Sequence, residues 1–395
     1  MQNDHPNITD AQIRDLFSSQ NKRHTEITAA IAGYNENGYP CPGANIMEHA
    51  QLNRLAARNG MENPDYVNDH VAVYARAQRE IGCDFCDQWI PDNPLSMRDQ
   101  GYEGGSFNAT TGDAKIIVDG MEIKEPEDVV EHLEKVEFPR LQRKIDNFDH
   151  EKRVREIGLS EYNQQHEIGL DVLKTGYDFI TFPILDYYRY GYENYFCAYQ
   201  LYEDVIEQHF KLQAKLSYKN NLAAAEAYNR YDLPKLYRLD HDMTDSRSTL
   251  VSLKSLEKIW FPQLACSLEP VLKNCGVRLI WHCDGNIMPM VPGLLDVGVR
   301  GFQGFQYEDG VDFAELCKLR GNDGQPLFMI AGVSVTRTLP FGTPADVRKE
   351  LEYLVSVHGD TALTLGCSSS LAPGVSSANI DALLEGLHYY KTHRK

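Results

Sequence analysis

The apolar and polar positions of the chain alternate in a regular way from Gly276 onward. Short apolar runs with strand periodicity are each followed by a longer stretch with helical periodicity, which is the pattern of consecutive βαβ units. The predicted strands are 277–281, 299–306, 327–333 and 362–365, and the predicted helices are 287–297, 311–320, 343–358 and 379–390. Four such units in a row make up half of a (β/α)₈ barrel.

The alternation continues upstream, although it is less regular there. Strands are predicted at 81–90, 177–184 and 236–239, and long helices at 127–146 and 203–218. Residues 115–123 predict a β-hairpin with Asp119-Gly120 at its turn. We therefore expect an α/β fold: a (β/α)8 TIM barrel over 71–395, with a hairpin insertion near 113–125 and a helical N-terminal extension over 1–70. A doubly wound open sheet is the alternative, but no Gly-x-Gly-x-x-Gly motif opens a helix.

Composition and charge narrow the range of functions. The 395 residues include 42% hydrophobic and 24% charged side chains, as is typical of a globular chain. The formal net charge of -18 would repel a phosphate backbone, so we expect no nucleic-acid partner. No apolar run approaches the roughly 18 residues that cross a bilayer, and residues 1–10 lack the features of a secretory signal. We expect a cytoplasmic protein with no membrane contact.

Reactive side chains follow several of the predicted strands. The active site of a barrel lies at the carboxyl ends of its strands, so these residues are the first candidates for chemistry. They are Cys83, Asp84, Cys86, Asp87, Asp240, His241, Asp242, His282, Cys283, Asp284, Gln303, Gln306 and Cys367.

His282 and Asp284 stand two positions apart at a strand end, so both are expected to project to the same side, with Cys283 on the other. Cys367 ends the last predicted strand and is expected to lie near them in a barrel. A histidine, a carboxylate and a thiolate with one open position are the ligands of a catalytic zinc ion. The same residues are also compatible with a structural His282–Asp284 hydrogen bond and a packed cysteine, and the spacing alone leaves both interpretations open.

Several segments resemble the uroporphyrinogen decarboxylase superfamily and, within it, the corrinoid-dependent methyltransferases. These segments are Gly191–Asn194, His241–Asp242, Leu250–Ser252, Trp281–Gln306, Ala331–Val333, Thr343–Val347, Leu365–Cys367, Asn379 and Tyr389–Tyr390. The resemblance covers most of 70–392 and implies a (β/α)₈ barrel, whereas residues 1–60 resemble no family.

Zinc methyltransferases of this superfamily carry His-x-Cys at one strand end and a later cysteine. Here the corresponding residues are His282, Asp284 and Cys367, so the resemblance implies these three as zinc ligands, with a carboxylate in place of one thiolate. A carboxylate donates less charge to zinc and leaves a harder Lewis acid, which suits an oxygen ligand better than a thiol. The substitution favours an O-demethylase type of methyltransferase over one that activates thiols.

The resemblance thus implies an enzyme that removes a methyl group from a small, methoxylated aromatic substrate and passes it to the cobalt(I) of a corrinoid protein. Asp284, Glu193, Asp87 and Asp242 are the catalytic candidates, with Asp284 or Glu193 as the proton donor. The substrate-binding candidates are Tyr192, Asn194, His241, Gln303 and Gln306. A homodimer is a possible assembly.

Two other functions remain open from the sequence. Uroporphyrinogen decarboxylases bind their substrate's carboxylates with an N-terminal arginine-rich motif, whereas this chain offers only Arg54 and Arg58 there, so decarboxylation of that tetrapyrrole is disfavoured. A related metal-free lyase would use Asp87 and His282 as acid and base on a carboxylated substrate. A barrel that binds a ligand without catalysis is the third interpretation.

Overall fold

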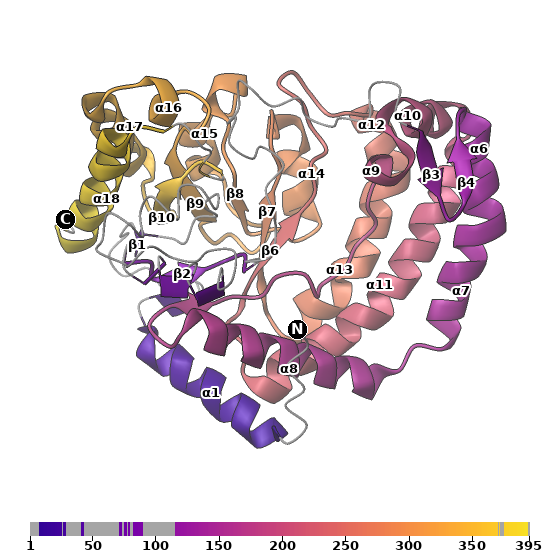
Figure 1. Cartoon of the computed structure of the whole chain (residues 1–395), viewed down its shortest axis with the longest axis horizontal. Helices are drawn as coiled ribbons and strands as arrows, with labels where there is room; N and C mark the ends of the chain where they lie inside the picture. Colours follow the sequence, from indigo (N-terminus) through magenta and orange to yellow (C-terminus); the bar gives the residue numbers. More distant parts are fainter. Residues whose placement is uncertain are drawn as a thin grey trace.

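The computed structural model describes residues 8–25, 27–28, 41–42, 71–72, 75–76, 78–79, 82–89, 115–369, 371 and 375–393. The fold is α/β, with parallel strands on one side of the molecule and a group of long helices on the other (Figure 1). No helix of the described ranges is both long and apolar enough to cross a membrane. Arg54 and Arg58 lie outside the described residues.

The central sheet is parallel, and its strands are ordered β1-β10-β9-β8-β7-β6. These strands are β1 (Cys41–Pro42), β6 (Leu236–Asp240), β7 (Arg278–His282), β8 (Gly301–Gln303), β9 (Phe328–Val333) and β10 (Ala362–Cys367). A second parallel pair, β2 (Phe85–Cys86) with β5 (Leu173–Lys174), is joined to β6 by a bridge between Gly176 and Tyr237. The parallel strands therefore follow one another as β2, β5, β6, β7, β8, β9, β10 and β1.

This series of strands is strongly curved. Phe85 on β2 and Phe328 on β9 have ring centroids only 6.3 Å apart, although β5, β6, β7 and β8 lie between those two strands in the pairing order. Both rings belong to one buried apolar cluster on the inner face. Its members are Ile27, Phe85, Leu173, Leu236, Ile280, Phe328, Ile330 and Ala362. The alternate residues of the same strands pack outward in the main core, against the helices.

In the C-terminal half a helix follows each strand, as predicted. The elements are η3 (Met288–Met290), α14 (Val291–Asp296), η4 (Tyr307–Asp309), α15 (Phe313–Lys318), α16 (Thr338–Phe341), α17 (Pro344–Val357) and α18 (Ser377–Thr392). Thr343 begins α17 with a capping box: its hydroxyl accepts from Asp346 N, and the Asp346 carboxylate accepts from Thr343 N. Pro344 occupies the first helical position, where no hydrogen-bonded N–H is needed.

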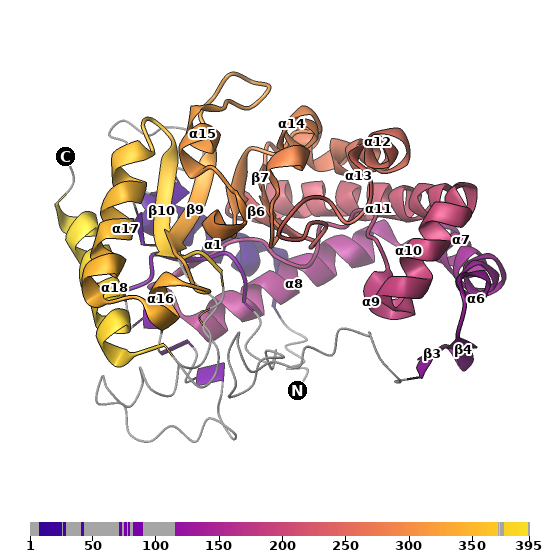
Figure 2. The ribbon, with the colours of Figure 1, turned by 90° about the horizontal axis from the view of Figure 1, so that it is seen from above.

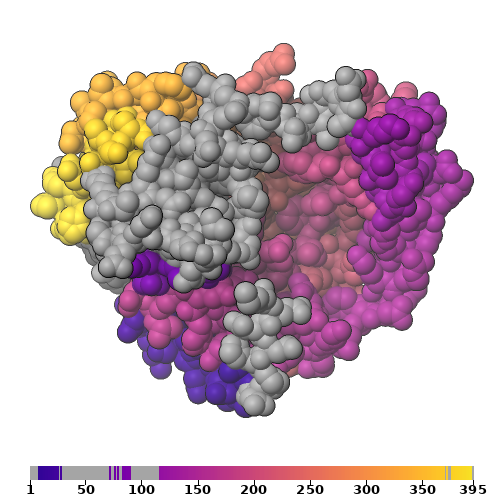
Figure 3. Space-filling view, viewed as in Figure 1, coloured from indigo at the N-terminus to yellow at the C-terminus, as the bar shows by residue number. Residues whose placement is uncertain are grey.

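Long helices make up the other side of the molecule. They and the short segments between them are α1 (Asp10–Arg23), α6 (Pro126–His132), η1 (Leu133–Glu137), α7 (Phe138–Asp146), α8 (His150–Ile168), α9 (Tyr187–Tyr190), α10 (Tyr192–Leu201), α11 (Glu203–Tyr231), α12 (Leu253–Ser255), η2 (Leu256–Trp260) and α13 (Phe261–Asn274). The predicted helix at 127–146 is present as α6 and α7, joined by a π-helical turn. In the space-filling view α6 and α7 form the magenta margin of the molecule (Figure 3).

The predicted hairpin is confirmed. Strands β3 (Ile116–Val118) and β4 (Met121–Ile123) pair antiparallel around Asp119-Gly120. Figure 2 shows this hairpin at the edge of the molecule, far from the parallel strands. Its Asp119 carboxylate accepts from His132, Arg140 and Arg189, which ties the hairpin to the helices beside it.

The strand predicted at 177–184 is wrong, because β5 ends at Lys174. The backbone amides of this stretch bond to side chains instead of a neighbouring strand: Phe179 N and Ile180 N donate to Tyr237 Oη. Within 81–90, only Phe85–Cys86 is a described strand. Residues 41–42, which we placed in the N-terminal extension, pair with β10 as part of the sheet.

Candidate functional site

The inner face of the curved sheet changes from apolar to polar toward the carboxyl ends of the strands. On β6, Leu236 belongs to the inner apolar cluster, and the period-2 alternation places Arg238 and Asp240 on the same face. On β7, Ile280 of the cluster is followed by His282 in the same way. The polar residues therefore gather above an apolar floor.

Asp240, Asp242 and His282 form a compact group of potential metal ligands, whose ligand atoms all lie within 4.8 Å of one another. Asp240 and His282 are register partners on β6 and β7, and Asp240 Oδ1 lies 3.9 Å from His282 Nε2. Asp284 Oδ1 lies 4.0 Å from the same nitrogen. Asp284 N also donates to Asp242 Oδ1 at 2.9 Å, which fixes the loop after β7 against the loop after β6.

The second oxygen of Asp240 is held by several donors. Arg238 Nη2 donates to Asp240 Oδ2 at 3.0 Å, Tyr177 Oη at 3.2 Å and Gln88 Nε2 at 3.4 Å. Arg238 is 4% exposed, and its Nη1 pairs with Asp87 Oδ2 at 3.2 Å. These contacts leave Oδ1 as the Asp240 oxygen that faces the imidazole.

Negative charge is in excess around His282. Burial raises the pKa of Asp240, but attraction by His282 and Arg238 outweighs it and brings the pKa below its usual value. Loss of hydration raises the pKa of Asp284 despite the attraction of His282, and repulsion from Asp242 acts in the same direction. The carboxylates of Asp240 and Asp242, with the carboxyl group of Asp284 beside them, therefore favour the presence of a cation near His282.

Several buried polar atoms of this region have no hydrogen-bond partner among the described residues. They are Gln88 Oε1, Arg238 Nε, His282 Nδ1, Asp284 Oδ1 and Gln303 Oε1. Buried polar atoms are ordinarily paired, so their concentration in one place indicates a ligand-binding site. Imidazole nitrogen and carboxylate oxygens are ligands of zinc and of other divalent cations, so the residues present fit such an ion.

Gly304 allows the His282 ring to take its position. Its φ of 82° lies in the left-handed region that favours glycine, and a Cβ at residue 304 would overlap His282 Nδ1. The other ring nitrogen, Nε2, is the one that faces the carboxylates of Asp240 and Asp284. Nε2 is therefore the candidate metal ligand of this ring.

Cys367, a predicted zinc ligand, is not brought into this group. Side chains along β10 point alternately to the two faces of the sheet. Ala362 belongs to the inner cluster, whereas Leu365 and Cys367 belong to the outer core together with Val333. Burial raises the pKa of the Cys367 thiol to about 12, which disfavours the thiolate that a metal requires. Cys367 therefore lies apart from the group of Asp240, Asp242 and His282.

Three of the predicted substrate-binding residues lie close to the group. Gln303 ends β8 as the register partner of His282, and its Oε1 is unpaired. Gln306 Oε1 accepts from Gly285 N at 2.8 Å and so supports the loop after β7. His241 Nε2 accepts from Leu185 N at 2.9 Å, and burial lowers its pKa to about 4, so this ring is a neutral structural acceptor.

An aromatic wall borders the group. Tyr187 Oη donates to Asp242 O at 2.6 Å, and Tyr188 Oη lies 3.4 Å from Asp242 Oδ2. The predicted substrate-binding residue Tyr192 is part of this wall, with its ring centroid 4.6 Å from that of Tyr187. Tyr188 is 64% exposed and offers an open ring face beside the carboxylate.

Two predicted site residues belong elsewhere. Asn194 Nδ2 donates to Ile123 O of the hairpin at 3.4 Å, and Glu193 is exposed at the start of α10. Asp87 is in the site, but as the ion-pair partner of Arg238. Arg238, Tyr177 and Gln88 were missed by sequence reasoning; the alternation Leu-Tyr-Arg-Leu-Asp over 236–240 was the available signal for Arg238.

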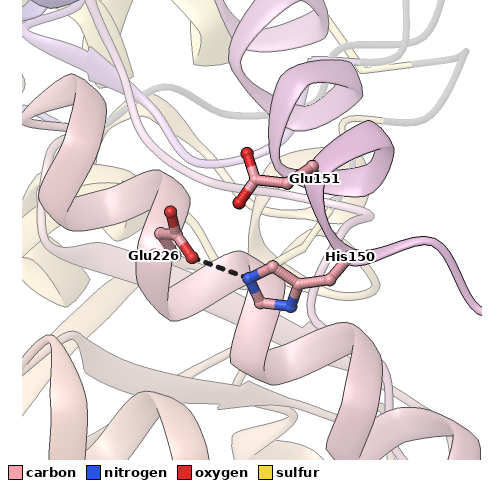
Figure 4. A group of neighbouring side chains, drawn as sticks. All are labelled: His150, Glu151 and Glu226. Carbon is pink, nitrogen blue, oxygen red and sulfur yellow. Dashed lines mark hydrogen bonds and ion pairs between the residues drawn. The ribbon is translucent and has the colours of Figure 1, made fainter.

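A second group of potential ligands, His150, Glu151 and Glu226, lies on the surface where α8 meets α11 (Figure 4). His150 Nε2 bonds to Glu226 Oε2 at 2.6 Å. Arg230 binds Glu226 and also lies 3.0 Å from Glu151 Oε2, so both carboxylates already have a cation. This group is a surface ion-pair network.

Comparison with known proteins gives a likeness of fold. No family model and no curated protein matches the chain. Among solved structures, a methyltransferase from Methanosarcina mazei is similar over 93% of this chain and 98% of that chain, with a TM-score of 0.55 and 15% sequence identity. The chain therefore has a fold like that of this methyltransferase, over nearly its whole length.

Proposed function

We propose that this protein is a methyltransferase whose site lies at the carboxyl ends of β6, β7 and β8. The observation that carries the proposal is the convergence of Asp240, Asp242 and His282 beside unpaired buried polar atoms. The likeness of fold to a methyltransferase supports it. A metal-free lyase receives less support, because the acid it requires, Asp87, is engaged with Arg238.

We infer that the strand series closes between β1 and β2 into a (β/α)₈ barrel. β1 and β2 stand at the two ends of the pairing order, and the contact between Phe85 and Phe328 spans the inner face. A closed sheet has no exposed edge, and its small interior is filled by side chains such as those of the inner apolar cluster. Closure also places the active site at one end of the barrel.

Asp240, Asp242 and His282 would hold a divalent cation, and zinc is the ion that we propose. Asp284 lies beside them. When bound, such an ion supplies Lewis-acid polarisation of a substrate oxygen. This ligand set consists of nitrogen and oxygen only, and it replaces the set with Cys367 that the family resemblance implied. A harder ligand set is consistent with an oxygen-bound methyl group as the substrate.

The substrate we propose is a small methoxylated aromatic compound, and the methyl acceptor is the cobalt(I) of a separate corrinoid protein. Tyr188, which is 64% exposed beside Asp242, offers a ring face on which an aromatic substrate would stack, and Tyr192 belongs to the same aromatic wall. The bond between the methyl carbon and the oxygen breaks, its electron pair stays on the oxygen, and Asp284 Oδ1 donates the proton that neutralises it. Asp284 is assigned this role because its Oδ1 is buried, unpaired and beside the ligand group.

The test is methyl transfer to a purified cobalt(I) corrinoid protein, followed by its absorption spectrum, with a panel of methoxyarenes. We expect transfer with the intact chain, loss with His282→Ala, and a rate lower by about 10²–10⁴-fold with Asp284→Asn if the proton donor is removed. Asp296→Asn, a change of the same type at the end of α14, is the control and should transfer at the rate of the unchanged chain. No transfer from methoxyarenes, methylamines or methyl thioethers would contradict the proposal.

A further inference from the structure

Arg238 lies inside the strand series, where a charged side chain is unusual. It is 4% exposed, and it stands on β6 between Leu236 of the apolar floor and Asp240 of the ligand group. Burying a guanidinium is unfavourable unless carboxylates pair with it and accept its hydrogen bonds. Here it donates to two, Asp87 Oδ2 through Nη1 and Asp240 Oδ2 through Nη2.

This arrangement determines how Asp240 is presented. Its Oδ2 accepts from Arg238, Tyr177 and Gln88, whereas its Oδ1 faces His282 Nε2 at 3.9 Å. A carboxylate with one oxygen saturated in this way has the other oxygen left for a metal ion and cannot easily rotate. Residues that bind metal ligands in this manner orient them and commonly change metal affinity by about 10–100-fold when replaced.

We propose that Arg238 is a positioning residue, anchored by Asp87, that holds Asp240 as a ligand through Oδ1. The inference rests on the proposed metal centre of the methyltransferase. It assigns Asp87 a role through Arg238, in place of acid–base chemistry on the substrate. The two terminal nitrogens of the planar guanidinium donate to both carboxylates at once. The single ammonium of a lysine does not reproduce this two-pronged geometry.

The experiment is a titration of the metal-free full chain with Zn²⁺, by calorimetry, and with Co²⁺, by the visible absorption that reports its coordination. Arg238→Lys should weaken binding of both ions by about 10–100-fold and alter the Co²⁺ spectrum. Arg278→Lys is the matched control. Arg278 is also a buried arginine, on the neighbouring strand β7, but it stands opposite Leu236 in the register, at the apolar end of the site. The Arg278→Lys variant should bind both ions with the affinity of the unchanged chain.

Tyr177→Phe keeps the guanidinium and removes a single donor to Asp240 Oδ2, so it tests the same idea if Arg238→Lys fails to fold. It should weaken binding by several-fold and shift the Co²⁺ spectrum in the same direction. Unchanged affinity and spectrum in Arg238→Lys, or in Tyr177→Phe where the lysine variant is unfolded, would overturn the inference while leaving the metal centre standing. A chain that binds no metal would overturn both, and absence of methyl transfer with metal binding still dependent on Arg238 would overturn only the proposed activity.

Discussion

Asp240 and His282 stand opposite each other in the register of β6 and β7, and the atoms they direct at each other, Oδ1 and Nε2, lie 3.9 Å apart. Two adjacent parallel strands thus deliver one carboxylate and one imidazole to the same point without the help of a flexible loop. Sites built on strands are held more rigidly than sites built on loops.

The first prediction separates the ligand set of the structure from the one implied by the family resemblance. His282→Ala and Asp240→Asn should each lose stoichiometric zinc, because each removes a ligand of the proposed centre. Cys367→Ser should retain it, because Cys367 packs in the outer core. Metal content after dialysis measures all three variants. Loss of zinc from Cys367→Ser together with its retention by Asp240→Asn would show that the Cys367 thiolate, and not Asp240, is a zinc ligand.

Gly304→Ala should displace the imidazole of His282. The new Cβ would overlap Nδ1 and the backbone would be strained at a φ of 82°, so we expect both lower stability and weaker zinc binding. Gly324→Ala is the control, since its φ is 77° and nothing lies within 4 Å of the new Cβ. It should lose stability through backbone strain alone and bind zinc normally. Equal zinc affinity in the two variants would show that Gly304 does not position His282.

Phe328→Ala tests the inner apolar cluster. Removing this ring from the middle of the curved sheet should lower the free energy of unfolding by about 3–5 kcal/mol, measured by denaturant titration. Ile117→Ala provides the comparison on the hairpin, where the side chain is 63% exposed, and should change stability by less than about 0.5 kcal/mol. A cost below about 1 kcal/mol for Phe328→Ala would mean that the rings do not pack inside the sheet.

His209 gives a prediction about pH. Burial lowers its pKa to about 4, below the value of 6.5 for an exposed histidine, so the unfolded chain takes up the proton first. The stabilisation by neutral His209 is complete above pH 6.5 and is lost as the pH falls toward 4, with a slope approaching about 1.4 kcal/mol per pH unit.

The stability difference between the unchanged chain and His209→Gln should therefore shrink as the pH falls from 7 to 4.5. The comparison is needed because Asp186, 3.8 Å from His209, has its pKa raised to about 6 by burial and changes stability in the opposite direction over the same range. Denaturant unfolding of both chains at several pH values measures the stability difference. A difference that stays constant with pH would show that folding does not lower the pKa of His209.

Much of the fold was accessible from the sequence because periodicity reports burial directly. The units after Gly276 and the helix capped by Thr343 follow from apolar alternation and from local hydrogen bonding. The stretch 177–184 misled the prediction, since its β-type residues are equally suited to a loop whose amides bond to Tyr237. Ile180 and its partner Tyr237 are 57 residues apart, and no local sequence pattern predicts a hydrogen bond over that separation.

The site was predictable only in part, for a similar reason. The spacing His282-x-Asp284 predicts a site at this strand end, and the structure places His282 in the group of potential ligands and Asp284 beside it. Alternate residues of β10 face opposite sides of the sheet, and Cys367 is on the outer side. The sequence alone does not determine which of the two alternating sets faces inward, because a shift of one residue exchanges them. The pairing of Arg238 with Asp87 depends on the curvature of the sheet, which no local motif encodes.

Asp87 and Arg238 are 151 residues apart in the sequence, yet each is the other's counter-ion in the buried interior. During synthesis the carboxylate leaves the ribosome long before the guanidinium that neutralises it. An N-terminal fragment ending before β6 would contain the aspartate without its counter-charge, so it should stay open, hydrated and accessible to proteases.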